Sequence, residues 1–184
     1  MTLALTLFQA LADSTRLRIF ALLRVMASSV GELAQVLGQS QPRVSRHVKI
    51  LEQSGLVRKR KEGNWVFLTL GEDYLVAPVF SALAHWNGAP DPEAQADSVR
   101  LEAVRAARAS AAEAYFETHA AQWDALRTLQ SAEKTVEQAI LKLVGATPCQ
   151  MVVDIGTGTG RMIELLAGHA QTVIGCDRSP AMLR

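Results

Sequence analysis

Two short amphipathic segments joined by only four residues constrain this chain more than any other feature. Ser29 and Glu32 have the spacing of a capping box, which predicts a helix that begins there and ends at Leu37. The turn GQSQ (residues 38–41) follows, and a second helical segment runs from it to Gly55. Two helices joined by so short a turn are typical of a helix-turn-helix unit.

Flanking segments add further helices to this unit. Hydrophobic periodicity predicts helices over residues 3–12, 14–24 and 73–87. The residues expected to face the core are Leu3, Leu7, Phe8 and Leu11 in the first helix, Leu17, Phe20, Ala21 and Val25 in the second, and Val44, Val48 and Leu51 in the second helix of the helix-turn-helix. Residues 56–60 and 65–70 alternate like two strands, with KEGN (61–64) as the hairpin tip.

Basic charge is concentrated in the same part of the chain. The formal net charge of the whole chain is only +1. Residues 1–75 carry ten Lys and Arg against six Asp and Glu, whereas residues 76–184 carry nine against twelve. Between Gln39 and Lys61, seven positive residues accompany the single Glu52. This asymmetry predicts a polyanionic partner for the first half only.

The second helix of a helix-turn-helix enters the major groove of DNA by its N-terminal end. Gln and Arg can reach base edges there, while Ser and Lys more often hold phosphates, and a basic hairpin suits flanking phosphates. The predicted DNA-binding residues are Ser40, Gln41, Arg43, Ser45, Arg46, Lys49, Lys59, Arg60 and Lys61. A solvated basic face on a small helical domain is the alternative, and His47 is either a packing residue or a base reader.

The second half begins with a linker and long helices. Two prolines in residues 89–92 indicate the linker, and the following Ala-, Glu- and Arg-rich segment 92–118 predicts a helix about 40 Å long. Another helix is expected over 131–144, with Val136, Ile140 and Leu143 facing inward. The pattern then predicts a strand over 150–155, a helix over 160–168, a strand over 172–177 and a helix starting at Ser179.

The segment VVDIGTGTG (152–160) leads from the first of these strands into the helix. Its spacing differs from the dinucleotide pattern G-x-G-x-x-G, because Arg161 stands where the third glycine belongs. The three glycines let a backbone pass close to a ligand, and Asp154 suits a cationic or amine-bearing group. Asp177, at the end of the next strand, can accept hydrogen bonds from ribose hydroxyls. A tight structural turn would give the same glycine pattern.

Cysteine content and hydropathy bound the class of protein. Cys149 and Cys176 lack a metal-binding spacing, so two reduced thiols are expected. No apolar run approaches the ~18 residues of a membrane span, and the N-terminus lacks a signal-peptide pattern. The sequence therefore predicts a soluble, cytoplasmic protein with no membrane partner.

The segments LADSTRLRIFALL (11–23) and VGELAQVLGQSQPRVSRHVKILEQSGLVRKRKEGNWVFLTL (30–70) resemble the ArsR/SmtB family of winged-helix repressors. The resemblance covers residues 5–86 and implies a homodimer formed through the helices 3–12 and 73–87. It also implies repression by occupying an inverted-repeat operator in double-stranded DNA. Metal-sensing members carry cysteines where this chain has ELAQV (32–36), and His85 stands alone, so no metal is expected.

The segments VVDIGTGTGRMIELLA (152–167) and VIGCDRSPAML (173–183) resemble two motifs of class I S-adenosylmethionine (SAM)-dependent methyltransferases. AYFETHAAQWDALR (114–127) resembles their entry region, where Tyr115, Phe116 and Trp123 either line the pocket or only pack a helix. The residues that the resemblance assigns to the ligand are Asp154, Gly156, Gly158 and Gly160 for the methionine end, Asp177 for the ribose and Arg178 beside the adenine.

These observations predict a mostly α-helical chain of three parts. Residues 1–88 are expected to form an α+β winged helix-turn-helix domain for DNA binding and dimerisation, and residues 89–145 a helical linker or lid. Residues 146–184 are expected to form a partial Rossmann-like α/β segment, the start of a SAM-binding domain. Because a complete domain of that class has several more strands, we expect a truncated domain of a longer protein, with no catalytic residue in this chain.

The predicted function is a dimeric transcriptional repressor whose second domain senses SAM or S-adenosylhomocysteine (SAH). This arrangement is similar to ArsR-type regulators fused to methyltransferase domains, which are tied to methionine and SAM-cycle genes. One alternative is a longer protein that methylates a small molecule and carries an attached DNA-binding domain. Others are a metal or redox sensor that uses Cys149 and Cys176, and a winged-helix dimer that the second half only stiffens.

Overall fold

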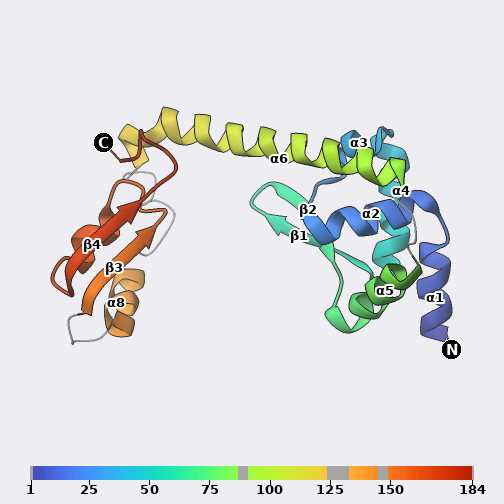
Figure 1. Ribbon diagram of the computed structural model, residues 1–184, viewed down its shortest axis with the longest axis horizontal. Helices are drawn as coiled ribbons and strands as arrows, with labels where there is room; N and C mark the ends of the chain where they lie inside the picture. Colours follow the sequence, from blue (N-terminus) through green and yellow to red (C-terminus); the bar gives the residue numbers. More distant parts are fainter. Residues whose placement is uncertain (1, 87–90, 124–132, 145–148, 184) are drawn as a thin grey trace. The chain divides into compact units, whose positions relative to one another are not determined.

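The computed structural model describes residues 2–86, 91–123, 133–144 and 149–183 (Figure 1). The chain divides into two compact units, Met1–Ala107 and Arg108–Arg184. Unit 1 contains, in chain order, α1 (Thr2–Leu11), α2 (Ser14–Val25), α3 (Val30–Leu37), α4 (Gln41–Gln53), β1 (Val57–Glu62), β2 (Trp65–Leu70), α5 (Asp73–Trp86) and the first half of α6 (Pro92–His119). Unit 2 contains the rest of α6, then η1 (Ala120–Gln122), α8 (Glu133–Val144), β3 (Cys149–Ile155), α9 (Arg161–Leu166) and β4 (Ala170–Cys176).

The helices of unit 1 begin where their capping residues predict. Asp13 accepts a hydrogen bond from the backbone N–H of Arg16 at 3.0 Å and caps α2. The capping box at the start of α3 is confirmed: the backbone N–H of Ser29 donates to Glu32 at 2.7 Å, and that of Glu32 donates to the Ser29 hydroxyl at 3.3 Å. Each bond satisfies a helix-terminal N–H that has no partner within the helix.

One apolar core joins the helices of unit 1. The stripe predicted for α4 is confirmed, since Val44, Val48 and Leu51 are all buried. Phe20 of α2 stacks on Phe80 of α5, with ring centroids 4.3 Å apart. The side chains that lose nearly all contact with solvent are Ile19, Phe20, Leu33, Val36, Val44, Leu51, Leu56, Val57 and Leu68.

The predicted inward faces of α1 and α2 are partly wrong. In α2, Ala21 and Val25 are exposed, and Ile19, Leu22 and Leu23 are buried instead. Apolar residues surround most of this helix, so periodicity alone does not select the buried face. In α1, Leu3 and Phe8 remain 56% and 62% exposed.

Strands β1 and β2 form the wing, an antiparallel hairpin with a two-residue connection. Lys61 pairs with Val66 and Glu62 pairs with Trp65, so only Gly63 and Asn64 lie between the strands. The predicted four-residue tip is therefore too long, because both Lys61 and Glu62 belong to β1. At the other end, the backbone of Ser28 bridges that of Leu68 with two hydrogen bonds.

Two glycines meet where the hairpin leaves the core. A Cβ placed on Gly71 would lie 1.9 Å from the backbone oxygen of Gly55, a distance that no side chain allows. The N–H of Gly71 donates to the carbonyl of Leu56 at 2.9 Å. This close backbone approach requires glycine. It holds the wing root, where β1 begins and β2 ends, against the end of α4.

The first half of α6 packs into unit 1. Its Leu101 and Val104 are buried in the shared core. Arg18 of α2 binds the buried carboxylate of Asp97 through two hydrogen bonds of 2.6 and 2.7 Å, and the hydrogen bonds raise the pKa of Arg18. Residues assigned to a linker by sequence thus contribute to the core of this unit.

Unit 2 contains a βαβ arrangement. β3 and β4 pair in parallel, with Val152 opposite Val173, and α9 connects them. α8 forms, but its Val136 and Leu143 are 52% and 86% exposed, contrary to the inward face predicted. After β4 the described chain makes turns where a helix was expected. No described helix in either unit is long and apolar enough to span a membrane.

Candidate nucleic-acid interface

The outer face of α4 carries the residues predicted to contact DNA. Val44, Val48 and Leu51 fix one side of the helix in the core, so the opposite side faces solvent. All six residues predicted to contact DNA on α4 and at its cap are exposed: Ser40, Gln41, Arg43, Ser45, Arg46 and Lys49. The side chain of Ser40 makes no capping hydrogen bond, so its hydroxyl is available to another acceptor or donor.

The turn before α4 positions this face. Gly38 ends α3 in a left-handed conformation, with φ of 64°, and its N–H donates to the carbonyls of Ala34 and Gln35. Pro42 occupies the first turn of α4, where no N–H is needed. The structure therefore contains the helix-turn-helix geometry that the spacing of residues 29–55 predicts.

His47 is half-buried and faces α2 rather than solvent. Its Nδ1 lies 3.5 Å from a carboxylate oxygen of Asp13, the cap of α2. Of the two roles considered for His47, this placement favours packing over base reading.

The cations of the wing are exposed, but most of them already have partners. Lys59 pairs with Glu52 at 2.7 Å and Arg60 pairs with Glu62 at 2.7 Å. Arg58, which was not among the predicted contacts, pairs with Glu72. Lys61 forms no ion pair with any residue that the structure describes.

The cations of α4 differ from those of the wing. Within the described ranges, Arg43, Arg46 and Lys49 have no carboxylate at ion-pair distance. Their full charges face solvent, where they can attract a polyanion. Sequence reasoning identified these cations but missed their different pairing, which depends on contacts outside the helix.

The glycine loop of unit 2 forms a second candidate site. Gly156, Gly158 and Gly160 all have positive φ, of 82°, 56° and 87°. The N–H groups of Gly156 and Thr157 donate to the carbonyl of Cys176 at 2.7 and 3.0 Å, which ties the loop to the end of β4. These backbone conformations explain why glycine recurs at every second position.

Asp154 and Asp177 flank this loop. One carboxylate oxygen of Asp154 is buried and has no hydrogen-bond partner among the described residues. Asp177 accepts hydrogen bonds from the N–H groups of Gly158, at 2.9 Å, and Ser179, at 2.8 Å. The backbone bonds from Ser179 and Gly158 lower the pKa of Asp177. Asp177 is thus a charged acceptor that organises the loop.

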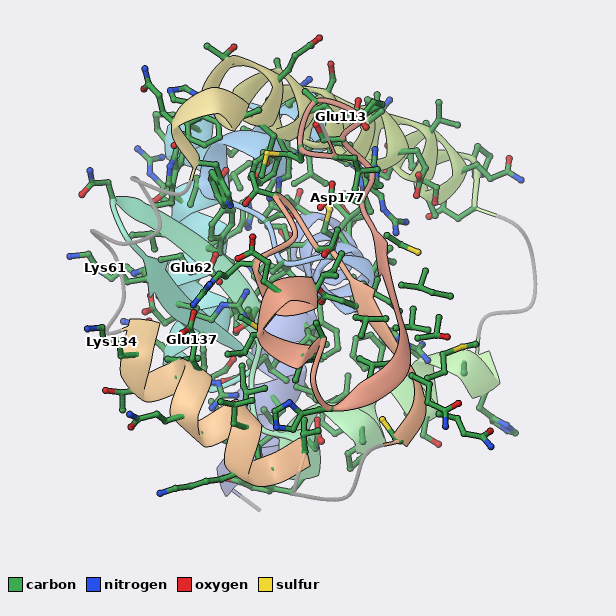
Figure 2. All side chains as sticks on the ribbon, turned by 90° about the vertical axis from the view of Figure 1, so that its left-hand side faces the viewer. Lys61, Glu62, Glu113, Lys134, Glu137 and Asp177 are labelled. Atoms are coloured by element: carbon green, nitrogen blue, oxygen red, sulfur yellow. The ribbon has the colours of Figure 1, made fainter. Side chains whose placement is uncertain are left out.

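Other residues surround the loop. Arg178 is exposed and pairs with Glu113 of α6. Figure 2 labels Glu113 and also Asp177, the residue that precedes Arg178. A Cβ on Gly158 would lie 3.6 Å from the indole nitrogen of Trp123, and Trp123 packs edge-on against Phe116. Sequence reasoning missed Gly175, where a Cβ would lie 2.5 Å from Ile163. A glycine inside a strand was the available signal.

Metal-ligating side chains do not gather in the described part of the chain. No group of three or more His, Cys, Asp or Glu there could hold a metal ion. Cys149 and Cys176 are free and exposed.

Comparison with known proteins gives consistent matches. A family model described as a helix-turn-helix domain matches residues 11–60. The arsenical resistance operon repressor of Escherichia coli is 46% identical over 69 residues, which cover 37% of this chain and 59% of that protein. An uncharacterized HTH-type transcriptional regulator of Methanocaldococcus jannaschii is 39% identical over 71 residues, covering 38% of this chain and 80% of that protein.

The transcriptional activator HlyU of Vibrio cholerae is 40% identical over 76 residues, which cover 41% of this chain and 70% of that protein. The match to a solved structure of HlyU covers 47% of this chain and 95% of the HlyU chain, with 34% identity and a TM-score of 0.43. This chain belongs to the helix-turn-helix transcriptional regulators. Within that class, its N-terminal unit is of the ArsR/SmtB winged-helix type. The match spans less than two thirds of the E. coli repressor.

Proposed function

We propose that unit 1 binds double-stranded DNA and represses transcription, with α4 in the major groove. The observation that carries the proposal is the exposed face of α4, on which Arg43, Arg46 and Lys49 have no ion pair among the described residues. Cations in this state can contact phosphates without first losing another partner, and arginine can also pair with a guanine edge. The ArsR/SmtB type of the unit agrees with this assignment.

We further propose that two copies bind an inverted-repeat operator through an interface of α1 and α5. An apolar groove of about 240 Å³ lies between these helices and is lined by Leu3, Ala4, Leu7, Phe8, Leu11, Tyr74, Leu75, Pro78 and Val79. Phe8 and Tyr74 are 62% and 74% exposed, which is unfavourable unless another surface covers them. A two-fold axis there would relate two α4 helices to successive major grooves.

Fluorescence anisotropy with duplex DNA from upstream of the chain's own gene tests the DNA contact. Arg46→Ala should weaken binding by about tenfold or more, because it removes a cation from the proposed major-groove face. Arg105→Ala is the matched control, since Arg105 is an exposed cation of unit 1 on α6. Equal affinities of the two variants would exclude α4 as the reading helix.

Sedimentation equilibrium tests the dimer. Phe8→Glu should shift the chain toward monomer and weaken operator binding, because it places a charge in the apolar groove. Val25→Glu is the control, since Val25 is equally exposed but does not line the groove. A monomeric wild-type chain that still binds the operator would contradict the dimer.

We also propose that unit 2 binds SAM or SAH at its glycine loop. The buried, unpaired oxygen of Asp154 supports this, because a carboxylate in that state gains most from a cationic or amine-bearing ligand. The methionine end of SAM carries such an amine, and Asp177 could accept from the ribose with its remaining lone pairs. Methionine and SAM-cycle genes are the proposed targets on the strength of the family resemblance alone.

The first half of α6 supplies the proposed coupling route into the DNA-binding unit. Arg100 donates to the carbonyl of Val36 in the last turn of α3 and to Asp97 at 2.7 Å. Carbonyls at a helix C-terminus lack partners within the helix, so Arg100 supplies one for α3, the helix that precedes α4. A change in α6 would therefore reach the helix-turn-helix through Asp97 and Arg100.

Calorimetry with SAH tests the ligand site. Asp154→Asn should weaken SAH binding by about tenfold or more, because it removes the charge that holds the amine. Gly168→Ala is the control, since a Cβ there meets nothing within 4 Å. Equal binding by the wild type and Asp154→Asn would remove Asp154 from the site, and absence of SAH binding by the wild type would contradict the proposal.

Stepwise addition of SAH to the anisotropy experiment tests the coupling. If SAH and DNA influence each other, SAH should change DNA affinity by about 5- to 150-fold, and DNA should change SAH affinity by the same factor. No change would leave two independent binding functions. Turnover of labelled SAM by a longer form of the protein would favour the methyltransferase alternative.

A further inference from the structure

We propose that Glu52, Glu62 and Glu72 limit the affinity of the wing for DNA by competing with phosphates for its cations. The inference rests on the proposed DNA binding of unit 1 and names residues that regulate its strength. It starts from the contrast between α4, whose cations have no ion pairs in the described structure, and the wing, where three of four cations have one.

The three glutamates come from different parts of unit 1. Glu52 lies in the last turn of α4, Glu62 ends β1, and Glu72 directly precedes α5. They pair with Lys59, Arg60 and Arg58 respectively. Glu52 and Glu72 thus reach β1 from neighbouring segments, whereas Glu62 lies on the strand itself, two residues after its partner.

The strand geometry decides which cation each glutamate can reach. Successive side chains point to opposite faces of a strand, so Arg58, Arg60 and Glu62 share one face and Lys59 and Lys61 share the other. Glu62 therefore pairs with Arg60, at 2.7 Å, and not with its neighbour Lys61. Lys61 and Glu62, the last two residues of β1, are labelled in Figure 2. Lys61 remains the wing cation without an ion pair in the described structure.

The pairs are open to solvent and to a competing anion. Their six side chains are between 35% and 58% exposed. Exposed pairs contribute little to stability, so a phosphate can displace the carboxylate, but the displaced negative charge then lies beside the DNA and repels it. The glutamates therefore weaken the sequence-independent part of binding, which comes mainly from phosphate contacts. Discrimination between DNA sequences then depends on α4.

The test measures binding of Glu52→Gln, Glu62→Gln, Glu72→Gln and the triple variant to two labelled duplexes of about 30 base pairs, long enough for two half-sites. One is the upstream DNA of the chain's own gene, and the other has a random sequence. At low salt, each single variant should bind the random duplex about two- to fivefold more tightly, and the triple variant at least about tenfold. The affinity of the triple variant should also fall more steeply as salt increases, because additional cations contact phosphates.

Two controls separate this mechanism from a change in net charge. Glu102→Gln removes the same charge from an exposed ion pair on α6, with Arg105 at 3.6 Å, and should leave DNA affinity nearly unchanged. In an Arg60→Ala background, Glu62→Gln should lose most of its effect, because the carboxylate acts through Arg60.

Three results would overturn the inference: unchanged affinity and salt dependence in the triple variant, an equal gain in Glu102→Gln, or an undiminished gain from Glu62→Gln without Arg60. A wild-type chain that bound neither duplex would instead contradict the proposed DNA binding itself.

Discussion

The two units of this chain bury their apolar side chains to very different degrees. In unit 1, helices α1 to α6 and the wing root share one core. In unit 2, Leu166 and Met182 are the buried apolar residues among those described, whereas Ile155 and Leu143 are 87% and 86% exposed. The cause is topology, because helices can enclose a core on all sides but two parallel strands with one connecting helix leave a sheet face open. A similar apolar pattern therefore has different outcomes in the two units.

The largest expected difference in stability is between two leucine-to-alanine substitutions, one in each unit. Leu101→Ala should lower the free energy of unfolding of unit 1 by about 2–5 kcal/mol, because it leaves a cavity in a closed core. Leu143→Ala should change stability by less than about 0.5 kcal/mol, because its side chain is already exposed. Urea denaturation followed by circular dichroism measures both. A large loss in Leu143→Ala would show that another surface covers α8 and would break the comparison.

A buried charge in unit 1 should give the next largest effect. Asp97→Asn should lower the free energy of unfolding by about 3 kcal/mol, because Arg18 then loses its buried anionic partner. The exposed pair formed by Glu102 offers a contrast, since Glu102→Gln should cost less than about 1 kcal/mol. Thermal and urea denaturation would show whether the two losses differ. Similar losses would mean that α6 is not firmly packed on unit 1.

Gly175 tests whether unit 2 has a tightly packed region despite its small core. Gly175→Ala should lower stability by about 1–3 kcal/mol, because the new Cβ would lie 2.5 Å from Ile163 and 2.7 Å from the Thr157 hydroxyl. Gly168→Ala adds the same methyl group where nothing lies within 4 Å, so it should have little effect. Hydrogen exchange of the β3 and β4 amides would report the difference. Equal protection in both variants would show that Ile163 and Thr157 can move to accommodate the added methyl group.

The smallest expected effect depends on pH. Because backbone hydrogen bonds lower the pKa of Asp177, its charge should stabilise unit 2 at pH values above the unfolded pKa of about 3.9. This contribution is lost as pH falls through the lower folded pKa. Asp177→Asn should therefore have a slightly lower Tm than the wild type near neutral pH, and the gap should close in acid. Glu117→Gln removes an exposed carboxylate from the same unit and is the control substitution.

Local signals in the sequence predicted much of unit 1. The capping box of Ser29 and Glu32 and the stripe of Val44, Val48 and Leu51 depend on residues within a few turns, so spacing was enough. The exposed face of α4 followed directly, because the remaining positions of an amphipathic helix must face solvent.

Contacts between distant segments were not predictable in this way. Arg18 and Asp97 are 79 residues apart, and no local pattern connects them. The pairing of Arg58 with Glu72 likewise depends on how the strand returns toward α5. The inward faces predicted for α2 and α8 differ from those observed for a related reason. Periodicity shows that a helix has an apolar side but not whether a neighbouring element covers it. The DNA contacts and the SAM site remain predictions, since each concerns a ligand.

The backbone contact between Gly55 and Gly71 has a consequence for how this regulator can change over generations. The anchor of the wing tolerates no side chain, whereas the charged residues beyond it are exposed and replaceable. Mutation can therefore alter the surface charge of the wing while its point of attachment stays fixed. The charge of the wing can thus change over evolution without a change of fold.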